Sequence, residues 1–236
     1  MKQVDVPICA NCEGRKNNSV FCKLSRDELD TLSDDRVDSF YKKGEVIFSE
    51  GNRGHGVYCI YQGKVKVHKD REDAKEQIVR LARAGDILGY RSLLCDEPYK
   101  ATATAMEDSV ICFIRKSKFH GVLDNNLLMA HKIIKLLAND LRDSERKMVN
   151  LAHKPVLERI AEALLVLKDR FGLKADNKTL NINITRREIG DLAGTSTETT
   201  IRTLAELNKT EAVRLNGRQI ELTDLNKLAE LANLPD

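Results

Sequence analysis

Hydrophobic and polar residues alternate in short runs between about Phe40 and Ile114. The runs are Val46–Phe48, Val57–Tyr61, Lys64–His68, Gln77–Leu81, Ala101–Ala105 and Val110–Ile114. Glycines separate many of them, at Gly44, Gly51, Gly54, Gly56, Gly63 and Gly85. Alternation with a period of two is typical of strands, and glycine permits the tight turns between them. The pattern therefore predicts an antiparallel sandwich or barrel.

The spacing becomes helical from Asn125 to about Leu151. Mostly apolar residues recur there in steps of three and four, as in a heptad repeat. This helix seam consists of Leu127, Ala130, Ile134, Leu137, Leu141, Ser144, Met148 and Leu151. Such a seam predicts a helix that pairs with its copy in a homodimer. The alternative is a helix that packs on its own domain.

Two short helices with a tight turn between them are predicted for Ile184–Leu207. Thr185 and Glu188 have the spacing of a capping box, which marks the start of a helix. Gly194 is expected to end this first helix, because glycine adopts the left-handed cap conformation at little cost. Two helices joined in this way are typical of a DNA-binding helix-turn-helix.

The second helix of the pair starts at Thr195 or Ser196, and Thr195 with Glu198 gives another capping-box spacing. We expect its buried stripe to consist of Ile201, Leu204 and Leu207. The opposite face carries Thr197, Glu198 and Arg202. An arginine can donate two hydrogen bonds to a guanine edge, and a carboxylate can accept one from cytosine. The alternative is that Glu198 and Arg202 form an ordinary surface ion pair.

A hairpin is predicted after this helix, from the runs Ala212–Leu215 and Arg218–Leu222. Asn216-Gly217 between them is a favoured two-residue turn. Arg214 and Arg218 are placed to contact phosphates, which position a protein on DNA without specifying its sequence.

Three further helices follow from capping residues and apolar spacing. Ser25 and Glu28 form a capping-box pair. Pro155 either ends the long helix or opens the next one, Val156–Phe171. A terminal helix is expected over 223–234. The resulting domains are a cysteine segment (1–24), a sensor domain (25–123), the long helix (124–152) and a DNA-binding domain (153–236).

The composition is ordinary for a globular protein of 236 residues, with 42% hydrophobic residues and a net charge of +3. This weak positive charge does not by itself indicate a nucleic-acid partner. No apolar run reaches the ~18 residues that a membrane helix needs, and the start lacks the apolar core of a signal peptide. We therefore expect a cytoplasmic protein without a membrane partner. Its six cysteines should be ligands or core residues rather than disulfides.

Cys9 and Cys12 form a C-x-x-C pair, and Cys22 follows in polar, irregular sequence. Zinc and iron–sulfur clusters normally have four protein ligands. The candidates for the fourth ligand are Cys59, Cys95 and Cys112. Cys59 and Cys112 lie in apolar runs, where a free cysteine often packs as a small hydrophobic residue. We assign that structural role to Cys59. An iron–sulfur cluster, zinc and thiol-based sensing remain alternatives for the others.

The segment TRREIGDLAGTSTETTIRTL, with the hairpin after it, resembles the winged helix-turn-helix of the CRP/FNR transcription regulators. KKGEVIFSEGNRGHGVYCIYQGKVKV is similar to the cyclic-nucleotide-binding β-roll of the same family. The resemblance implies an α+β fold with an N-terminal antiparallel β-roll, a long dimerisation helix and a C-terminal winged helix-turn-helix. It implies palindromic double-stranded DNA and RNA polymerase as partners. The implied DNA-binding residues are Thr185, Arg186, Thr197, Glu198, Arg202 and Arg218.

Among these residues, the resemblance implies that Glu198 and Arg202 contact bases and that Thr185 contacts a phosphate. Thr197 and Ile201 replace residues that help to choose the target in the best-known members. The resemblance therefore predicts a recognition helix of the family type with a half-site of its own.

In nucleotide-binding relatives, a glutamate holds the ribose and an Arg-Ser pair holds the phosphate. The corresponding stretch is GDILGYRSLLCDEPYKATA, with Tyr90 at the glutamate position and Lys100-Ala101 at the Arg-Ser position. Lysine lacks the two-pronged grip of arginine on phosphate, and alanine lacks a hydroxyl donor. We therefore predict that a cyclic nucleotide is not the ligand.

The resemblance narrows to the oxygen-sensing FNR branch, whose members hold a [4Fe–4S] cluster on three N-terminal cysteines and one cysteine late in the β-roll. EDSVICFIRKSKF matches the context of the late cysteine. The implied metal ligands are Cys9, Cys12, Cys22 and Cys112, with zinc as the alternative metal. The relatives also carry an acidic residue on the dimer seam, where this chain has Ser144.

The sequence thus predicts a homodimeric, sequence-specific transcription regulator, not an enzyme, that senses oxygen, nitric oxide or redox state. One alternative is a regulator of the same fold without a cluster, gated by another small ligand or by thiol oxidation. Another is a small iron–sulfur electron-transfer protein or enzyme. DNA titration separates this last alternative, because binding to DNA depends steeply on salt.

Overall fold

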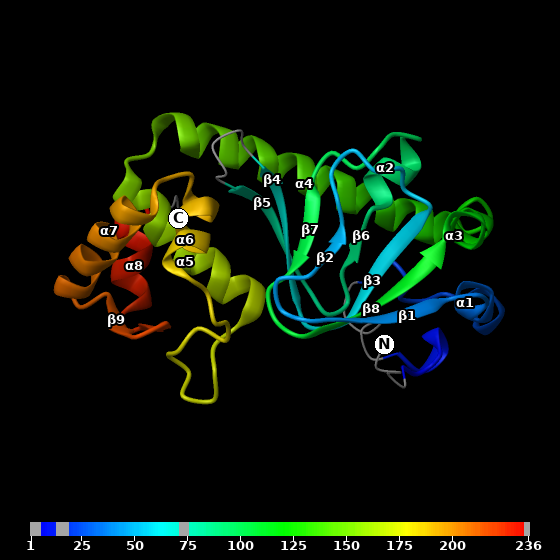
Figure 1. Ribbon diagram of the computed structural model, residues 1–236, viewed down its shortest axis with the longest axis horizontal. Helices are drawn as coiled ribbons and strands as arrows, with labels where there is room; N and C mark the ends of the chain where they lie inside the picture. Colours follow the sequence, from blue (N-terminus) through cyan, green and yellow to red (C-terminus); the bar gives the residue numbers. More distant parts are fainter. Residues whose placement is uncertain (1–5, 13–18, 71–75, 234–236) are drawn as a thin grey trace. The chain divides into compact units, whose positions relative to one another are not determined.

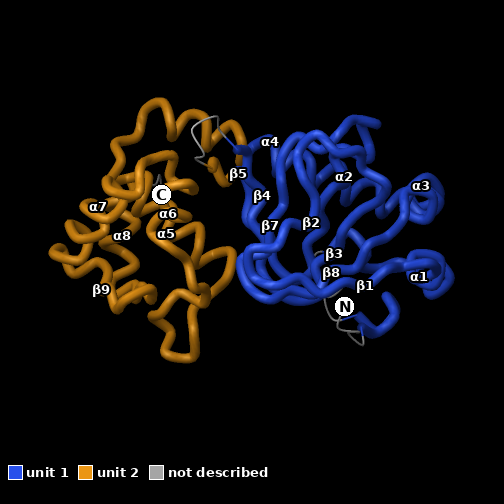
Figure 2. The backbone as a smooth tube through the Cα atoms, viewed as in Figure 1, with its two compact units in different colours: residues 1–70, 79–142 blue, residues 71–78, 143–236 orange. Residues whose placement is uncertain are grey.

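The computed structural model describes residues 6–12, 19–70 and 76–233. The chain divides into two compact units, shown in different colours in Figure 2. Unit 1 comprises residues 1–70 and 79–142, and unit 2 comprises residues 71–78 and 143–236. Parts of the predicted cysteine segment, 1–5 and 13–18, lie outside the described residues.

The part of the chain before helix α4 (Leu127–His153) contains two four-stranded sheets (Figure 1). The first has the order β1 (Val37–Tyr41), β8 (Ser109–Arg115), β3 (Gly56–Gln62) and β6 (Ile87–Leu88). The second has the order β2 (Val46–Phe48), β7 (Thr102–Ala105), β4 (Lys64–Asp70) and β5 (Glu76–Arg83). The strand pairs β1/β8, β3/β8, β3/β6, β2/β7 and β4/β7 are antiparallel. The six predicted strands and the α+β fold class are confirmed, whereas β1 and β6 are additions.

The first sheet is apolar on both faces, which alternate along each strand. One face packs with Ile60 and Ile111 against the second sheet. The other face carries Val57 and Ile114 and is covered by helices. These are α1 (Arg26–Ser33), α3 (Lys116–Leu123) and the first part of α4 (Leu127–His153). Alternation along β3 and β8 assigns Cys59 and Cys112 to this helix-covered face.

The shorter helices of unit 1 surround these sheets. Ser25 and Glu28 form the predicted capping box at the start of α1. The 3-10 helix η1 (Cys9–Asn11) and helix α3 are not predicted from the pattern. Helix α2 (Tyr90–Leu94) follows β6 directly and begins after Gly89, which has a left-handed φ of 79°.

Helix α4 is continuous over 27 residues and carries two apolar stripes. Met129 and Ile133 are buried in the core of unit 1. Ile134, Leu141 and Met148 of the helix seam are instead 61%, 61% and 65% exposed. Both interpretations therefore apply in part. One stripe packs on the helix's own domain, and Leu137 of the seam packs there too, whereas the other large seam residues stay exposed in the single chain.

Unit 2 consists of helices and a two-stranded sheet. Its elements are the end of α4, α5 (Val156–Phe171), α6 (Arg186–Ala193), α7 (Thr197–Lys209), β9 (Val213–Asn216), β10 (Gln219–Leu222) and α8 (Leu225–Leu231). Helix α5 has its predicted bounds, with Pro155 as the N-cap. Helix α8 is shorter than the predicted 223–234, and residue 234 lies outside the described residues. Within the described part of the chain, no helix has the length and hydropathy to cross a membrane.

Candidate nucleic-acid interface and cysteine site

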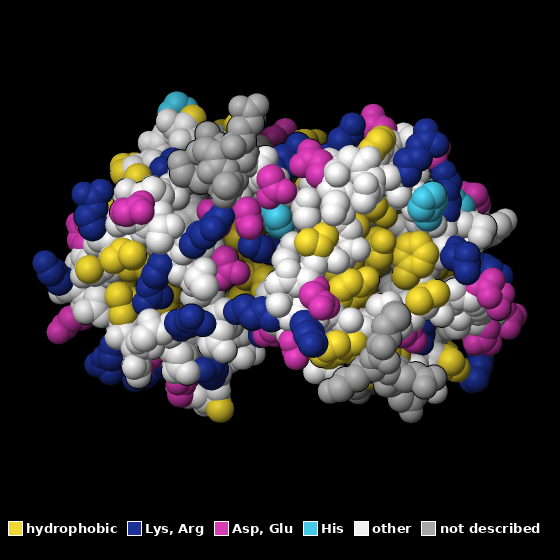
Figure 3. Space-filling view, in the orientation of Figure 1, with side chains coloured by type: hydrophobic (Ala, Val, Ile, Leu, Met, Phe, Trp, Pro, Cys, Tyr) yellow, Lys and Arg dark blue, Asp and Glu magenta, His cyan; other side chains and the backbone are white. Residues whose placement is uncertain are grey.

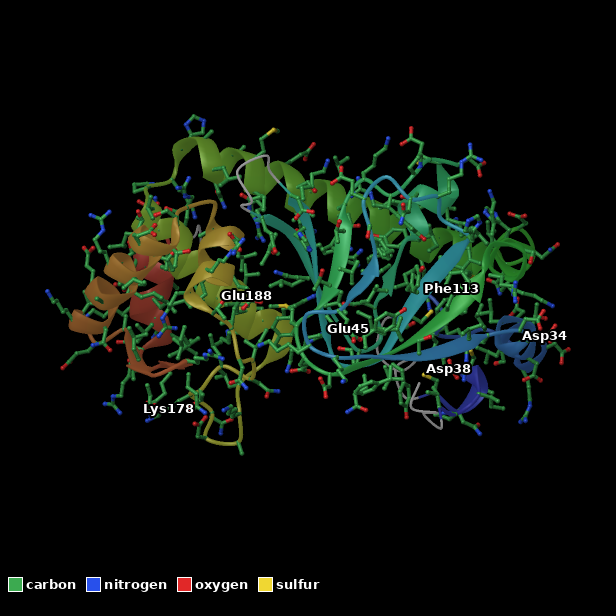
Figure 4. The ribbon with its side chains drawn as sticks, viewed as in Figure 1. Asp34, Asp38, Glu45, Phe113, Lys178 and Glu188 are labelled. Atoms are coloured by element: carbon green, nitrogen blue, oxygen red, sulfur yellow. The ribbon has the colours of Figure 1, made fainter. Side chains whose placement is uncertain are left out.

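Helices α6 and α7 form the predicted helix-turn-helix. Thr185 Oγ1 accepts from the N–H of Glu188 at 3.1 Å, and the Glu188 carboxylate accepts from the N–H of Thr185 at 2.8 Å. This capping box fixes the start of α6, where Figure 4 labels Glu188. Gly194 ends α6 with a φ of 68°. A Cβ on Gly190 would lie 2.8 Å from Thr200 Oγ1, so glycine permits the two helices to approach closely.

Helix α7 begins at Ser196, whose hydroxyl oxygen accepts from the N–H of Thr199 at 3.1 Å. Of the two predicted caps, Ser196 is the one used, and the predicted capping box of Thr195 with Glu198 is not formed. The buried side of α7 consists of Thr200, Thr203, Leu204 and Leu207. Two of these are threonines, which a search for apolar residues overlooks.

The assignment of Ile201 to the buried stripe of α7 is wrong, because Ile201 is 53% exposed. Thr200 is buried instead, and its hydroxyl donates to the Ser196 carbonyl at 2.8 Å. Glu198 lies beside both Ile201 and Arg202 on the helix surface, since residues three and four apart are neighbours. Glu198 and Arg202 are exposed and Thr197 is half-buried. We call Thr197, Glu198, Ile201 and Arg202 the recognition face.

Strands β9 and β10 form the predicted wing, with a turn shifted by one residue. Asn216 pairs with Gln219, so the turn is Gly217-Arg218 and not Asn216-Gly217. Gly217 has a φ of 57°, which the first position of such a two-residue turn requires. Arg186, at the start of α6, donates to the Gly217 carbonyl at 2.9 Å. This bond connects the wing to the helix-turn-helix.

The wing presents the two predicted arginines to solvent. Arg214 and Arg218 are exposed, and the Arg214 guanidinium lies 3.5 Å from Glu221. Such an exposed pair is weak, so a phosphate can replace its carboxylate. Figure 3 shows Lys and Arg side chains spread over the visible face of unit 2. A recognition face of acidic, basic and apolar side chains beside a basic wing fits the major groove and its flanking phosphates.

A row of polar and sulfur side chains crosses the helix-covered face of the first sheet. Cys112 of β8 lies directly opposite Asp38 of β1 and directly opposite Cys59 of β3. Side chains at opposed positions of antiparallel strands share a face and approach each other closely. Figure 4 labels Asp38 on β1, beside η1. Cys112 is buried and Cys59 is half-buried.

Helix η1 carries Cys9 and is followed by Cys12, both half-buried. The N–H of Cys9 donates to Ser33 Oγ of α1 at 3.0 Å, and the N–H of Cys12 donates to the Cys9 carbonyl at 3.3 Å. Cys9, Ala10 and Cys59 pack against one hydrophobic group on the helix-covered face. The C-x-x-C pair therefore lies at the sheet that holds Cys59 and Cys112.

Arg36 fixes this segment to β1. Its guanidinium donates to the carbonyls of Val6 and Pro7 at 3.1 and 3.0 Å, and to Cys9 Sγ at 3.5 Å. It also pairs with Asp38 at 2.7 Å, and its side chain is only 7% exposed. Burial acts to lower the pKa of Arg36, but Asp38, Cys112 and Cys9 together outweigh it and the pKa is raised. A permanent positive charge therefore stands beside the thiols.

The pKa values of Cys59 and Cys112 show the effect of neighbouring thiols. Burial raises the pKa of Cys59, the neighbouring thiols of Cys112, Cys9 and Cys12 raise it further, and Arg36 opposes them. Burial likewise raises the pKa of Cys112, and Arg36 again opposes the shift. These effects place the four sulfurs in one neighbourhood. We call Cys9, Cys12, Cys59 and Cys112 the thiol site.

The contacts of Cys22 and Cys95 differ from those of the thiol site. Cys22 sits in a turn, and its carbonyl accepts from Lys132 Nζ of α4. Within the described residues, no interaction joins the Cys22 thiol to the other sulfurs. Cys95 is exposed at the end of α2. Three of the four predicted ligands therefore come together, with Cys59 as the fourth sulfur.

The thiol site has the donors of a metal centre, because thiolates bind zinc and iron–sulfur clusters. Among the described cysteines, no three sulfurs lie within 4.8 Å of one another. A tetrahedral zinc with Zn–S bonds near 2.3 Å would need its sulfurs about 3.8 Å apart. The positive charge of Arg36, which contacts Cys9 Sγ, suits the negative charge of bound thiolates.

The position that holds the ribose in nucleotide-binding relatives is occupied here by a buried tyrosine. Tyr90 is 1% exposed, and its hydroxyl bonds Asp140 of α4 and accepts from Arg80 at 2.8 Å. Burial, followed by the Asp140 contact, raises the pKa of Tyr90 against the effect of Arg80. Lys100 is exposed and pairs with Glu97 at 3.2 Å. Tyr90 therefore supplies no carboxylate for a ribose, and Lys100 supplies no two-pronged ligand for a phosphate.

Three features escape prediction from the sequence: the role of Arg36, the Tyr90–Asp140 contact and the grouping of Cys59 with the other thiols. Arg36 and Asp38 stand two positions apart, but nothing in that spacing shows that the guanidinium reaches back to residues 6–9. The signal available for Cys59 is its place in an apolar strand together with Cys112 in another. That signal becomes informative only when the register of β3 and β8 is known.

Two protein families match the chain. The family "Cyclic nucleotide-binding domain" matches residues 39–126, and "Crp-like helix-turn-helix domain" matches residues 158–231. Residues 39–126 contain nearly all of both sheets described above, and residues 158–231 contain the helix-turn-helix and the wing. The two matched regions therefore correspond to the sheets and to the candidate interface.

The chain is also similar to known regulators over most of its length. It is 30% identical over 217 residues to "Cyclic AMP receptor protein" of Thermus thermophilus, covering 92% of this chain and 98% of the relative. It is 27% identical over 215 residues to "Fumarate and nitrate reduction regulatory protein" of Vibrio cholerae, covering 89% and 85%. The solved structure of FixK2 from Bradyrhizobium japonicum is similar with a TM-score of 0.76 and 27% identity, covering 85% of this chain and 99% of that one.

Proposed function

The chain belongs to the CRP/FNR family of DNA-binding transcription regulators, and from that premise we propose that it is a homodimer that recognises a palindromic site and senses oxygen, nitric oxide or redox state through an iron–sulfur cluster. Its partners would be double-stranded DNA, a second copy of the chain and RNA polymerase. The observation that carries the sensing part is the meeting of the C-x-x-C pair with Cys112 on the first sheet.

The recognition face supports the DNA part of this proposal. Arg202 can donate two hydrogen bonds to guanine, Glu198 can accept from cytosine, and Ile201 offers an apolar surface to a thymine methyl group. Thr185 at the start of α6, and Arg218 on the wing, would bind phosphates. Two copies of α7 in a dimer would then contact half-sites about one turn of DNA, ~34 Å, apart.

The signal would reach α4 through residues 19–22. Lys132 Nζ of α4 donates to the Ser19 carbonyl at 3.2 Å and to the carbonyl of Cys22. Val20 and Phe21 pack in the same core as Met129 and Ile133 of α4. A change at the cysteines therefore acts on the helix that carries the seam, and a small free-energy bias suffices to shift a two-state element.

An iron–sulfur cluster, when bound, would supply a centre that reacts with oxygen or nitric oxide. Cys9, Cys12 and Cys112 would hold it, with Cys22 or Cys59 as the fourth ligand. Arg36 would keep the Cys9 segment against β1 and neutralise thiolate charge. Zinc is the alternative metal. A regulator gated by another ligand or by thiol oxidation remains the alternative function.

A cyclic nucleotide is a weaker candidate, although one relative is named a cyclic AMP receptor. Tyr90 fills the ribose position and is bonded to Arg80 and Asp140. Lys100 is exposed and paired with Glu97. We therefore propose that DNA binding responds to the state of the cysteines and not to cyclic AMP.

Two measurements test the proposed function. Titration with a DNA palindrome should give specific binding whose affinity falls steeply with salt, because phosphate contacts release counterions. An electron carrier would show neither sequence preference nor this salt dependence. Anaerobic purification with absorbance, iron and acid-labile sulfide assays should give a coloured, iron-containing protein. A colourless, iron-free protein under these conditions would remove the cluster, and zinc by elemental analysis would select the other metal.

A further inference from the structure

Cys59 lies directly across a strand pair from a predicted ligand. It stands opposite Cys112 in the antiparallel β3/β8 ladder. Side chains at opposed positions have Cβ atoms about 5 Å apart, on the same face. The two strands are paired along that ladder from Gly56 to Gln62. The backbone therefore holds these two thiols as a pre-formed pair.

The C-x-x-C segment lies over this pair. Cys9 and Cys59 pack against the same hydrophobic group, and Cys59 also packs beside Cys112 and Val6. Arg36 bonds Cys9 Sγ directly, so its charge stands between the segment and the sheet. The β3/β8 strand pair and the C-x-x-C segment are thus both held by contacts that do not involve Cys22.

Cys22 is anchored in a different way. Its backbone carbonyl is held by Lys132, and the adjacent Phe21 and Leu24 are buried in the core of unit 1. Among the residues that the structure describes, no interaction joins the Cys22 thiol to the other sulfurs, and the position opposite Cys112 is taken by Cys59. The bonds of Lys132 and the packing of Phe21 hold Cys22 in its turn.

We propose that Cys59, and not Cys22, completes the ligand set, so that Cys9, Cys12, Cys59 and Cys112 together hold the metal centre. This inference rests on the proposed metal-dependent sensing. It assigns two ligands to rigid, neighbouring strands and two to the short η1 segment. Loss of the centre would then leave η1 held by Arg36 and Ser33 and leave the sheet pair in place, while Cys22 remains a part of the packing between the N-terminal segment and α4.

The full-length protein and three single variants test the proposal. Cys59→Ala, Cys22→Ala and Cys95→Ala are reconstituted anaerobically with ferrous iron and sulfide, and iron, acid-labile sulfide and absorbance are measured per chain. We expect Cys59→Ala to lose the chromophore and most of its iron. Cys22→Ala should keep the content of the parent, as should the exposed control Cys95→Ala. Loss in Cys22→Ala with retention in Cys59→Ala would overturn the assignment.

A second measurement on the unaltered protein covers the case in which Cys59→Ala does not fold. The parent is treated with iodoacetamide in its loaded and metal-free forms, and modification at each cysteine is followed by mass spectrometry. Cys22 should react at the same rate in both forms, whereas Cys9 and Cys12 should be protected only when loaded. Equal protection of Cys22 and Cys9 by the metal would contradict the proposal.

The outcomes separate this inference from the proposed function. A parent that takes no iron but binds zinc, and loses it in Cys59→Ala, would uphold the four ligands and overturn the iron–sulfur cluster. A parent that holds iron with Cys22 as ligand would uphold the cluster and overturn the role of Cys59. A parent that binds neither metal would overturn both.

Discussion

Arg36 shows how a single side chain can fix an otherwise irregular segment. It bonds two backbone carbonyls, Cys9 Sγ and Asp38, and it is almost fully buried. We predict that Arg36→Met lowers the free energy of unfolding of the metal-free protein by about 3 kcal/mol, because it leaves the Asp38 charge without its partner. Urea denaturation followed by circular dichroism measures this loss.

The control for this prediction is the double variant Arg36→Met/Asp38→Asn. Removing the carboxylate charge as well should restore part of the lost stability, so the two single effects should not add. Additive losses would show that the ion pair does not contribute, and that Arg36 acts only through its bonds to Val6 and Pro7.

Ile201 gives a prediction about base recognition. It is 53% exposed on α7 beside Arg202, where an apolar side chain can contact a thymine methyl group. Ile201→Ala should weaken binding to the cognate site by about 1 kcal/mol, the value of a buried methyl group or slightly more. Replacing one thymine of the half-site by deoxyuridine should weaken binding by the parent protein to the same extent. It should leave binding by the Ile201→Ala variant almost unchanged.

A DNA titration with both sites and both proteins measures this coupling. Arg202→Ala is the comparison, since it should lose ~1–3 kcal/mol on the cognate site and relax a different base position. If deoxyuridine weakened Ile201→Ala and the parent equally at every thymine, Ile201 would have no role in recognition.

At the scale of elements, the predictable parts are those whose signals are local. Helix α5 has its predicted bounds because Pro155 and Gly172 mark its two ends. The capping box at Thr185 likewise places α6 correctly. Strand β1 escapes prediction because all but one of its residues are half-buried, which removes the alternation between polar and apolar positions. The two residues of β6 are too few to show a period.

The thiol site shows why the other features of the candidate site could not be predicted from the sequence. Spacing and family resemblance single out Cys9, Cys12 and Cys112, and the contacts of Cys9 and Cys112 place both at the first sheet. The neighbour of Cys112 depends on which residue of β3 stands opposite it, and register between distant strands leaves no mark in the local pattern. Ile201 is misplaced for a similar reason, because a buried threonine takes the inner position.

The helix-turn-helix itself makes a prediction through Gly190. A Cβ there would stand 2.8 Å from Thr200 Oγ1 and 2.9 Å from the Thr195 carbonyl. Gly190→Ala should therefore push α6 away from α7, cost about 2 kcal/mol in stability and weaken DNA binding. Thermal unfolding and DNA titration of the same preparation measure the two effects.

Gly121→Ala is the matched control. Gly121 lies in helix α3, and a Cβ at that position would meet nothing within 4 Å. Alanine is a better helix former than glycine, so this variant should be slightly more stable than the parent, with unchanged DNA binding. A Gly190→Ala protein as stable as the parent would show that α6 and α7 can separate without cost.

At the scale of the molecule, α4 is the element that both units share, since the division between residues 142 and 143 falls inside it. Its buried stripe, with Met129 and Ile133, belongs to the core that also contains Val20 and Phe21 of the N-terminal segment. Ile134, Leu141 and Met148 of its helix seam are exposed in the single chain. The proposed change at the cysteines and the proposed pairing of two copies would therefore act on different sides of one helix.

Pairing through the helix seam predicts a specific effect of Leu141, which is 61% exposed. Leu141→Glu places two like charges against each other where two apolar side chains would meet, so the dimer should dissociate. Affinity for a full palindrome should fall on the order of 100-fold, because the second half-site is no longer bound intramolecularly. Affinity for a single half-site should stay the same.

Lys135→Glu provides the control, because Lys135 is an exposed residue of the same helix that lies outside the seam. Sedimentation velocity and titration with full and half palindromes should show a dimer with the affinity of the parent. A Leu141→Glu protein that stayed dimeric would place the pairing surface elsewhere on the chain. A monomeric one that bound the full palindrome as tightly as the parent would show that recognition does not need two copies, and the seam would then have no part in selecting a palindrome.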